Sequence, residues 1–426
     1  MYDTLHMMRT TMLVALAACF LTLLLTLERG TYAWKGDDDV DEVEEDDDDF
    51  DFVTTNVGKK FLNGIILDFV KHDRFVEVQC DGQECAADSS GDIPSVWERG
   101  LVTSKLKPKL ILQEHGRAAT KVEKKFKGET LGYVTPWNNR GYDWAKKFAA
   151  KFTYISPVWL QVREDPDQVP IITGTHDIGS QWVLDVKNGV EGGEGPAIVP
   201  RVVYERNRLS SEDIPVIIDK MLELAIQHEF DGMVFEIPVT AGTLDMLQQM
   251  GRAFRAADKL LILVLARSSQ EGELPVTHEL FNDLAPLVHR FSMNAYDFSA
   301  PGPNAPYLWL KETLEKMSPM ERQKVLMGIP FYGYDNTDAI TGSTYIQTLK
   351  DNDISKIRWE ATAHECQHVY TAAGTGSHHV VFFPCLQFLQ DRLKLYKEHR
   401  VGVAIWELGQ GMCLLINPSV SDVTCN

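Results

Sequence analysis

The fold of this chain is decided by one short apolar stretch, FDGMVFEIP at residues 230–238. Its β-branched and aromatic residues are typical of a strand that is buried on both faces. Side chains two apart on a strand share a face, so Val234, Glu236 and Pro238 are predicted to point together into the interior. Glu236 is the only acid of the three. Because a buried charge needs a partner, the pattern favours a paired structural carboxylate.

Similar runs recur from Thr130 onward, with helical patterns between them. The eight predicted strands are Leu131–Pro136, Phe152–Leu160, Ala197–Tyr204, Gly232–Ile237, Leu260–Ala266, Arg290–Tyr296, Val325–Tyr332 and Val401–Glu407. The clearest helices are predicted at Ile214–Phe230, after the capping residues Ser211-Glu212-Asp213, at Leu244–Ala257 and at Phe388–His399. Eight strands alternating with helices over about 300 residues predict an α/β fold, a (β/α)8 TIM barrel.

The spacing breaks once, between the seventh and eighth strands, where about 70 residues intervene. Three strand-like runs fall there, and we expect a small β-rich insertion at about residues 335–384, with runs at Ile357–Trp359, Cys366–Thr371 and His379–Phe383. The barrel is assigned to residues 129–426. Before it lies an N-terminal extension or arm, residues 56–128, in which Val57–Lys71 has a helical pattern.

The first 55 residues are predicted to stand apart from the core. Residues 1–33 carry an apolar run, Thr11–Leu27, after Arg9, which fits a cleaved signal peptide. Residues 34–55 form an acidic segment that is predicted to be disordered, because its twelve acids between Asp37 and Asp51 repel one another. This segment accounts for most of the net charge of −19, and the chain lacks a basic footprint for nucleic acid. We expect no membrane span once the signal is cleaved.

Six cysteines remain after the predicted signal: Cys80, Cys85, Cys366, Cys385, Cys413 and Cys425. An even number in a secretory chain permits disulfides, but the spacing does not give their connectivity. Cys80 and Cys85 share a polar loop, CDGQEC, and are the expected local pair.

The order of strand motifs resembles that of the family 18 glycoside hydrolases. Besides FDGMVFEIP, the matching blocks are LGYVTPWNNRGYD (131–143), FTYISPVWLQV (152–162), FSMNAYDF (291–298), PGPNAP (301–306), GIPFYGYD (328–335), YIQTLKD (345–351), HHVVFFP (378–384) and IWELGQG (405–411). In that family the fourth strand has the pattern D-x-x-D-x-D-x-E, whose last Glu protonates the leaving oxygen. Here the four positions hold Asp231, Val234, Glu236 and Pro238, so the catalytic acid is missing. The Ser-x-Gly-Gly expected on strand three is also absent.

The resemblance implies a sugar site at the carboxyl ends of the strands, where aromatic faces and polar tips meet a pyranose. Trp406 matches the aromatic floor of the family, and Tyr296 and Asp297 match its Met-x-Tyr-Asp pattern with one extra residue. The candidate ligand-binding residues are Trp406, Tyr296, Asp297, Glu236, Met293, Tyr133, Trp137, Trp159, Tyr332 and Glu407. No cofactor or metal is implied. The segment His364-Glu365-Cys366-Gln367-His368 matches the zinc-protease pattern, but its alternation predicts a strand, whereas that chemistry needs a helix.

Three hypotheses about function follow. The first is a chitinase-like, lectin-like protein, secreted or delivered to the lysosomal lumen, that binds an oligosaccharide or amino-sugar polymer without cutting it. The second is a weak hydrolase in which Glu236 or Glu407 serves as a displaced acid. The third is an interaction protein with a vestigial groove, since the resemblance implies a scavenger-type receptor (stabilin) as a partner.

Overall fold

The computed structural model describes residues 93–117, 124–190, 193–267, 273–412 and 415. The predicted signal peptide, the acidic segment, the helix-like Val57–Lys71 and four cysteines (Cys80, Cys85, Cys413 and Cys425) lie outside these residues. Among the described residues, no helix combines the length and the apolar character that a bilayer crossing requires.

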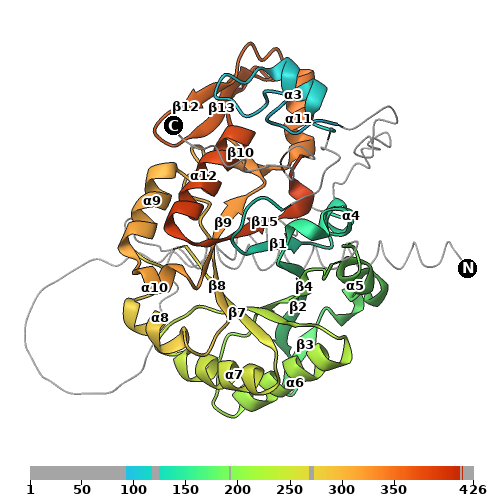
Figure 1. The fold of residues 1–426 in the computed structure, drawn as a ribbon, viewed down its shortest axis with the longest axis vertical. Coiled ribbons are helices and arrows are strands. Elements are labelled where there is room, and N and C mark those ends of the chain that lie inside the picture. Colours follow the sequence, from blue (N-terminus) through green and yellow to red (C-terminus); the bar gives the residue numbers. More distant parts are fainter. Residues whose placement is uncertain (1–92, 118–123, 191–192, 268–272, 413–414, 416–426) are drawn as a thin grey trace, which may run out of the picture. The chain divides into compact units, whose positions relative to one another are not determined.

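Parallel strands form a closed barrel in the described part of the chain (Figure 1). The barrel strands are β1 (Thr130–Val134), β2 (Tyr154–Glu164), the pair β4 (Ala197–Ile198) and β5 (Arg201–Tyr204), β6 (Gly232–Glu236), β7 (Leu260–Leu265), β8 (Arg290–Met293), β9 (Val325–Pro330) and β15 (Gly402–Trp406). Strand β1 pairs with both β2 and β15, which closes the barrel. The predicted (β/α)8 barrel is confirmed, and every predicted strand lies over an observed one.

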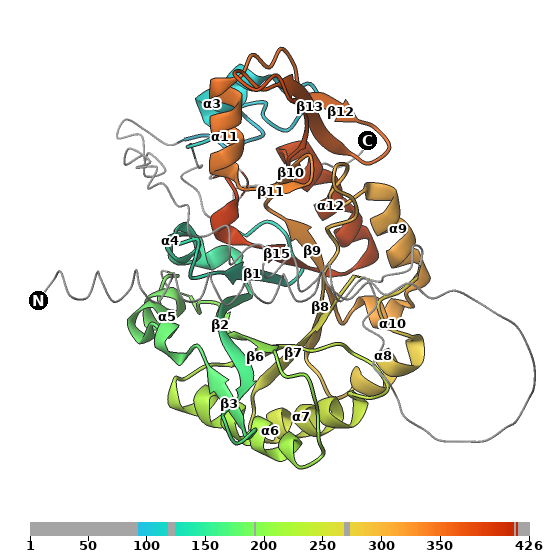
Figure 2. The same cartoon turned by 180° about the vertical axis from the view of Figure 1, so that it is seen from behind.

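Helices cover the outside of the barrel, as Figure 2 shows from behind. They are α4 (Arg140–Lys147), α5 (Ser180–Lys187), α6 (Asp213–Gln227), α7 (Leu244–Ala256), α8 (His278–Leu284), α9 (Tyr307–Lys316), α10 (Pro319–Arg322) and α12 (Leu386–His399), with short 3-10 turns η2 (Ala149–Lys151), η3 (Thr175–Asp177) and η4 (Leu408–Gln410). The predicted cap of α6 is wrong. No side chain caps that helix, and Asp213 instead pairs with Arg206 at 2.8 Å.

Two layers of apolar side chains make up the core. Alternate residues of the strands fill the barrel interior: Leu131, Tyr133, Tyr154, Val158, Val199, Val234, Ile262, Val264, Leu326 and Ala404. The opposite faces of the same strands pack against the helices, as Phe235 does beside Val234. Strands buried on both faces need continuous apolar sequence, which is why these runs could be found without structural information.

The insertion after β9 is a five-stranded antiparallel sheet with strand order β11-β10-β14-β13-β12. It contains β10 (Gly333–Asp335), β11 (Asp338–Ile340), α11 (Gly342–Asp351), β12 (Arg358–Glu360), β13 (Glu365–Thr371) and β14 (His378–Phe382). Helix α3 (Pro108–Glu114), from the N-terminal extension, packs against α11 (Figure 1, Figure 2). A hairpin strand, β3 (Pro170–Thr173), pairs with the far end of β2 and was not predicted.

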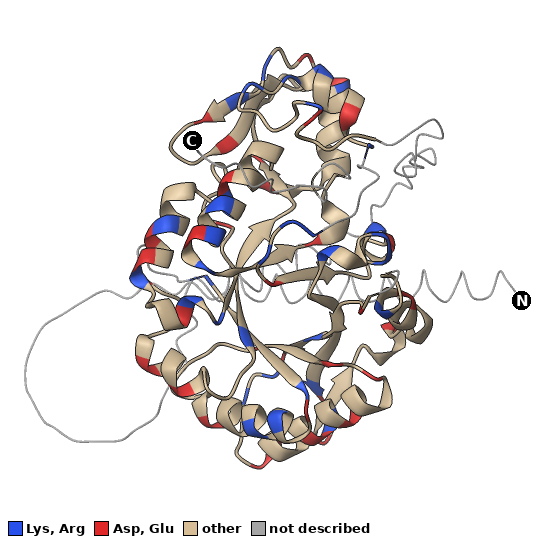
Figure 3. Ribbon diagram, viewed as in Figure 1, with Lys and Arg blue, Asp and Glu red and all other residues tan. Residues whose placement is uncertain are grey.

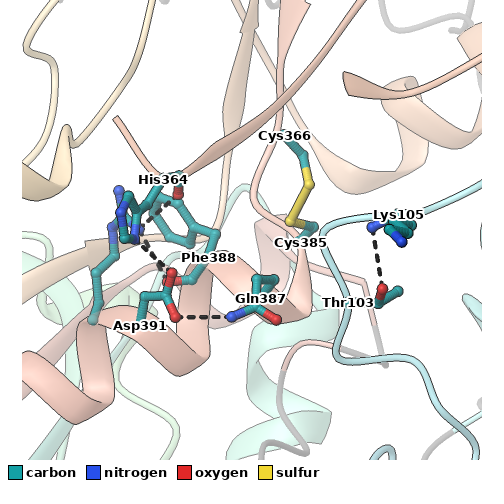
Figure 4. The surroundings of a disulfide bond; sticks show 9 residues. Thr103, Lys105, His364, Cys366, Cys385, Gln387, Phe388 and Asp391 are labelled. Carbon is teal, nitrogen blue, oxygen red and sulfur yellow. Dashed lines mark hydrogen bonds and ion pairs between the residues drawn. A yellow bond between two sulfur atoms is a disulfide. The ribbon is translucent and has the colours of Figure 1, made fainter. Parts of the chain in front are cut away.

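The insertion is fastened to α12 by covalent and polar contacts (Figure 4). A disulfide joins Cys366 on β13 to Cys385, the residue that precedes α12. Nearby, His364 Nδ1 lies 2.7 Å from Asp391 Oδ2. The HExxH segment runs into strand β13, as its alternation predicted, so its two histidines are not one helical turn apart.

Candidate functional site

The carboxyl ends of the barrel strands bring polar and aromatic side chains together. Arg201 of β5 is the centre of this group: it pairs with Glu236 at the end of β6. Its guanidinium lies over two rings, 4.6 Å from the ring centroid of Trp406 and 5.6 Å from that of Tyr133. The Tyr133 hydroxyl donates to Ser292 Oγ at 2.8 Å. Cation–π contact and ion pairing together hold Arg201 across the mouth of the barrel.

The Arg201–Glu236 pair is largely withdrawn from water, with side chains 13% and 17% exposed. Burial is the largest single influence and by itself would lower the pKa of the Arg201 guanidinium, but Glu236, Tyr133 and Tyr296 together outweigh it and hold that pKa above its ordinary value. Burial also raises the pKa of Tyr133 to about 12, so its hydroxyl stays protonated and can only donate or accept hydrogen bonds. The Arg201–Glu236 pair therefore carries one positive and one negative charge, and the neighbouring Tyr133 hydroxyl is neutral.

A second group surrounds Asp297, which follows β8. Its Oδ1 accepts from the hydroxyls of Tyr332 and Tyr334, the latter at 2.6 Å. The backbone of Asp297 has a φ of 60°, a left-handed conformation that Asp tolerates better than most residues, and its N–H donates to Asn304 Oδ1 at 2.7 Å. Burial first, and then the Asp297 carboxylate, raise the pKa of Tyr334. This tyrosine–aspartate cluster thus presents one exposed carboxylate held in a fixed direction.

A third group is built around Glu407, directly after Trp406. Its carboxyl is fully buried and accepts from Asn138 Nδ2 and from the N–H of Gly409, each at 2.9 Å. Removal from water raises the pKa of Glu407 to about 8, although both hydrogen bonds act to lower it. Glu407 therefore ties the loop after β1 to the turn after β15, and it holds a proton at neutral pH.

Burial separates the ten predicted ligand-binding residues into two sets. Four of them are accessible to solvent: Trp137, which is 48% exposed, and Asp297 are exposed, and Trp406 and Glu236 are partly exposed. The other six are buried: Tyr133, Met293, Tyr296, Tyr332, Trp159 and Glu407. Tyr133 belongs to the group around Arg201, and Tyr332 to the group around Asp297. The Tyr296 hydroxyl donates to Asn294 Oδ1 at 2.9 Å. These buried tyrosines therefore support the exposed residues of the rim.

Two of these predictions do not fit the structure. Trp159 is fully buried on the helix side of the barrel, where its Nε1–H donates to the Tyr142 hydroxyl at 2.6 Å and its ring meets Trp182 edge-on. Pairing with β3 extends β2 to Glu164, so Trp159 is not at the strand end. Met293 is buried in the layer between strands and helices. Neither side chain faces the rim.

Sequence reasoning missed Arg201, although it stands in a strand that is otherwise apolar. A cation in such a strand needs an anion nearby. The inward-pointing Glu236 had already been identified, so the pair could have been proposed from the sequence. Tyr334 and Asn138 were also missed. Charged residues of both signs are spread over the outer helices, and the barrel strands are mostly uncharged (Figure 3).

The chain was compared with known proteins. No protein-family model matches it. The uncharacterized glycosylase YvbX of Bacillus subtilis (strain 168) is 24% identical over 212 residues, a match that spans 45% of this chain and 61% of that protein's length.

Solved structures with a similar fold include a chitinase from Chromobacterium violaceum ATCC 12472, with a TM-score of 0.57, 18% identity and coverage of 70% of this chain and 100% of that one. The Bacillus cereus spore cortex-lytic enzyme SleL has a TM-score of 0.53 and 17% identity, and the match covers 70% of this chain and 74% of that one. A family 18 chitinase from Cycas revoluta, solved with (GlcNAc)3, has a TM-score of 0.54 and 13% identity, and the match covers 68% of this chain and 98% of that one. The chain therefore shares the (β/α)8 barrel fold of these chitinases and of the cortex-lytic enzyme.

Proposed function

We propose that this chain is a chitinase-like protein of the family 18 type that binds amino-sugar oligosaccharides at the barrel rim and does not hydrolyse them. The observation that carries the proposal is the end of β6. The strand stops at Glu236, whose carboxylate is held by Arg201, and the position of the family acid is Pro238. Pro238 is exposed there and has no side-chain proton to give.

The loss of that acid has a large chemical consequence. A positioned general acid contributes about 10² to 10⁴ in rate. Glu236 is a poor substitute, because its carboxylate is engaged by Arg201 at the barrel mouth. A sugar would also have to displace the guanidinium from the rings of Trp406 and Tyr133 to reach it.

The recognition groups, in contrast, remain. Trp137 and Trp406 precede the hydrogen-bonded Asn138 and Glu407 in the chain, and both offer exposed aromatic surface. Asp297 adds an exposed carboxylate that can accept from sugar hydroxyls. The complex of the Cycas revoluta chitinase with (GlcNAc)3 supports N-acetylglucosamine oligomers as the first ligands to test.

We place the protein in an oxidising compartment, secreted or in the lysosomal lumen. The disulfide between Cys366 and Cys385 supports this, since such bonds are rare in reducing compartments. Within the family, the sequence motifs resemble chitinase domain-containing protein 1, a stabilin-interacting chitinase-like protein. We accordingly keep a scavenger-type receptor as a proposed partner.

The test is calorimetric binding of (GlcNAc)3, paired with chromatography for shorter products. We expect binding without cleavage, and affinity at least about tenfold weaker in Trp406→Ala, because a buried aromatic anchor is worth about 2 kcal/mol or more. Trp359→Ala, in the insertion sheet, is the matched control and should bind as wild type. No binding by wild type across chitin and peptidoglycan oligosaccharides, or equal affinity in Trp406→Ala, would refute the proposal.

A weak hydrolase is the second candidate, and one observation favours it: Glu407 is a protonated carboxyl next to Trp406. Its burial and its two hydrogen bonds argue against contact with a substrate. Product release that disappears in Glu407→Gln would establish this function. Release that disappears only in Glu236→Gln would assign the acid to β6 instead.

A further inference from the structure

Away from the barrel rim, the insertion sheet brings a serine, a histidine and an aspartate into line. Ser377 ends the turn between β13 and β14, and its Oγ lies 2.9 Å from His379 Nε2. The other ring nitrogen, His379 Nδ1, lies 2.6 Å from Asp335 Oδ1, at the end of β10. These contacts have the order of a nucleophile, a base and an orienting carboxylate.

With Asp335 ionised and His379 neutral, the hydrogen bonds assign a role to each atom. An ionised Asp335 can only accept, so His379 Nδ1 carries the proton between them. In the neutral imidazole Nε2 is then an acceptor, and the Ser377 hydroxyl donates its proton to it. Thr375 Oγ1 lies 2.8 Å from Ser377 Oγ, and because the Ser377 proton is already committed, Thr375 donates in that contact.

The base is held from two sides. Tyr370 donates its hydroxyl to Asp335 Oδ2 at 2.7 Å, which fixes the carboxylate. The Tyr370 ring also stacks on the His379 ring, with centroids 4.6 Å apart and planes 20° apart. Asp335 and His379 are 13% and 24% exposed, whereas Ser377 is exposed at the tip of the hairpin. A sheltered base beneath an open hydroxyl is an arrangement that can activate the hydroxyl.

We propose that Ser377 is a nucleophile for acyl transfer from small carboxylic esters, with His379 as its general base and Asp335 as the residue that positions the imidazole. The Ser377 oxygen attacks the ester carbonyl while His379 Nε2 takes its proton. The carbon–oxygen bond to the alcohol breaks, and the alcohol leaves with that proton. His379 then takes a proton from water, the resulting hydroxide cleaves the acyl-serine bond, and that proton returns to the Ser377 oxygen as the acid leaves, with no change of oxidation state.

The open surroundings set the expected rate and substrate. Thr375 Oγ1, 2.8 Å from Ser377 Oγ, is a hydroxyl donor near the place where the carbonyl oxygen of the ester would become an oxyanion. A pair of backbone N–H donors would do more, and each missing donor costs about 10² to 10³ in rate. We therefore expect slow turnover of small esters that approach from solvent. This site does not depend on the proposed saccharide binding.

The experiment uses the whole chain, a fluorophosphonate probe and peptide mapping of the serine adducts. The internal reference is the exposed Ser343, whose Oγ lies 2.8 Å from Thr341 Oγ1. We expect Ser377 to react about 100-fold faster than Ser343, the lower end of what a general base supplies. His379→Gln, which keeps a polar side chain but cannot take the proton, should remove that advantage.

Two further variants separate chemistry from folding. His378→Gln changes the neighbouring histidine, which contacts Thr371, and should leave labelling unchanged. Release of nitrophenol from p-nitrophenyl acetate should fall in Ser377→Ala, an exposed substitution that leaves the sheet intact. Labelling of Ser377 no faster than that of Ser343, labelling indifferent to His379→Gln, or ester release equal in Ser377→Ala and wild type would each overturn the proposal.

Discussion

Glu407 gives the sharpest test of the structure, because its burial has a thermodynamic consequence. Its side chain is fully enclosed and its pKa is raised from 4.5 to about 8 by removal from water. In the unfolded chain the same carboxyl titrates near its ordinary value. Between these two pKa values the folded state binds a proton that the unfolded state has lost, so stability must fall as pH rises.

The size of the effect follows from the shift. Each pH unit in that window costs about 1.4 kcal/mol, so by pH 7 the folded state has lost about 3 kcal/mol relative to pH 4.5. The contribution is fully present below pH 4.5, declines up to about pH 8 and is constant above it. Because typical domains are stable by only about 5 to 15 kcal/mol, this loss is measurable.

The perturbation is Glu407→Gln. The amide cannot ionise, its oxygen can still accept from the Gly409 N–H, and Asn138 can rotate its amide to accept from the new NH2 group. We expect near-equal stability of wild type and variant at pH 4.5 to 5. At pH 7 the variant should be more stable by about 3 kcal/mol, with a flatter pH profile.

The assay is denaturant unfolding across pH 4.5 to 8. The free energy of unfolding of wild type is subtracted from that of the variant at each pH, so the contribution of the histidines that both proteins share cancels. Glu315→Gln, on the exposed surface of α9, is the control and should follow wild type at every pH. Parallel profiles for wild type and Glu407→Gln would refute the reasoning, since they would mean that Glu407 is ionised in the folded protein.

Two further predictions concern the barrel itself. Arg201→Met should destabilise the fold by about 3 to 5 kcal/mol in denaturant unfolding, because it leaves the Glu236 carboxylate largely withdrawn from water and without its partner. A second change, Glu236→Leu, should restore most of the loss, and an undiminished loss in the double variant would contradict this. Gly232→Ala should prevent the pairing of β6 with β7, because its Cβ would lie 2.1 Å from the Leu260 carbonyl oxygen. The control is Gly242→Ala, whose Cβ would lie 3.7 Å from its nearest neighbour. Equal melting temperatures for the two variants would contradict the packing argument.

Most of the barrel could be predicted because its information is local. Strands buried on both faces require apolar runs, and the helices between them require an apolar stripe, and both patterns can be recognised within a few residues. The strand β3 was missed because its identity as a strand comes from pairing with the end of β2. The cap of α6 was misassigned because Asp213 has a better partner in Arg206, seven residues earlier in the chain.

The site could be predicted only in outline. The inward acid Glu236 was recognised as one that needs a partner, and the missing acid at Pro238 was evident from the motif. The identity of the partner was not, since Arg201 is 35 residues away. Trp159 was placed at the rim from its position in the motif, and the length of β2 puts it among the helices instead.

The sequence by itself determined the (β/α)8 barrel, the place of its insertion and the absence of an acid at Pro238, because residue type and spacing carry those properties directly. The tertiary structure decided which side chains reach solvent at the rim, which cation holds Glu236 and why Glu407 keeps its proton. Those properties depend on strand register and on the water excluded by distant segments, and neither is encoded in any single stretch of the chain.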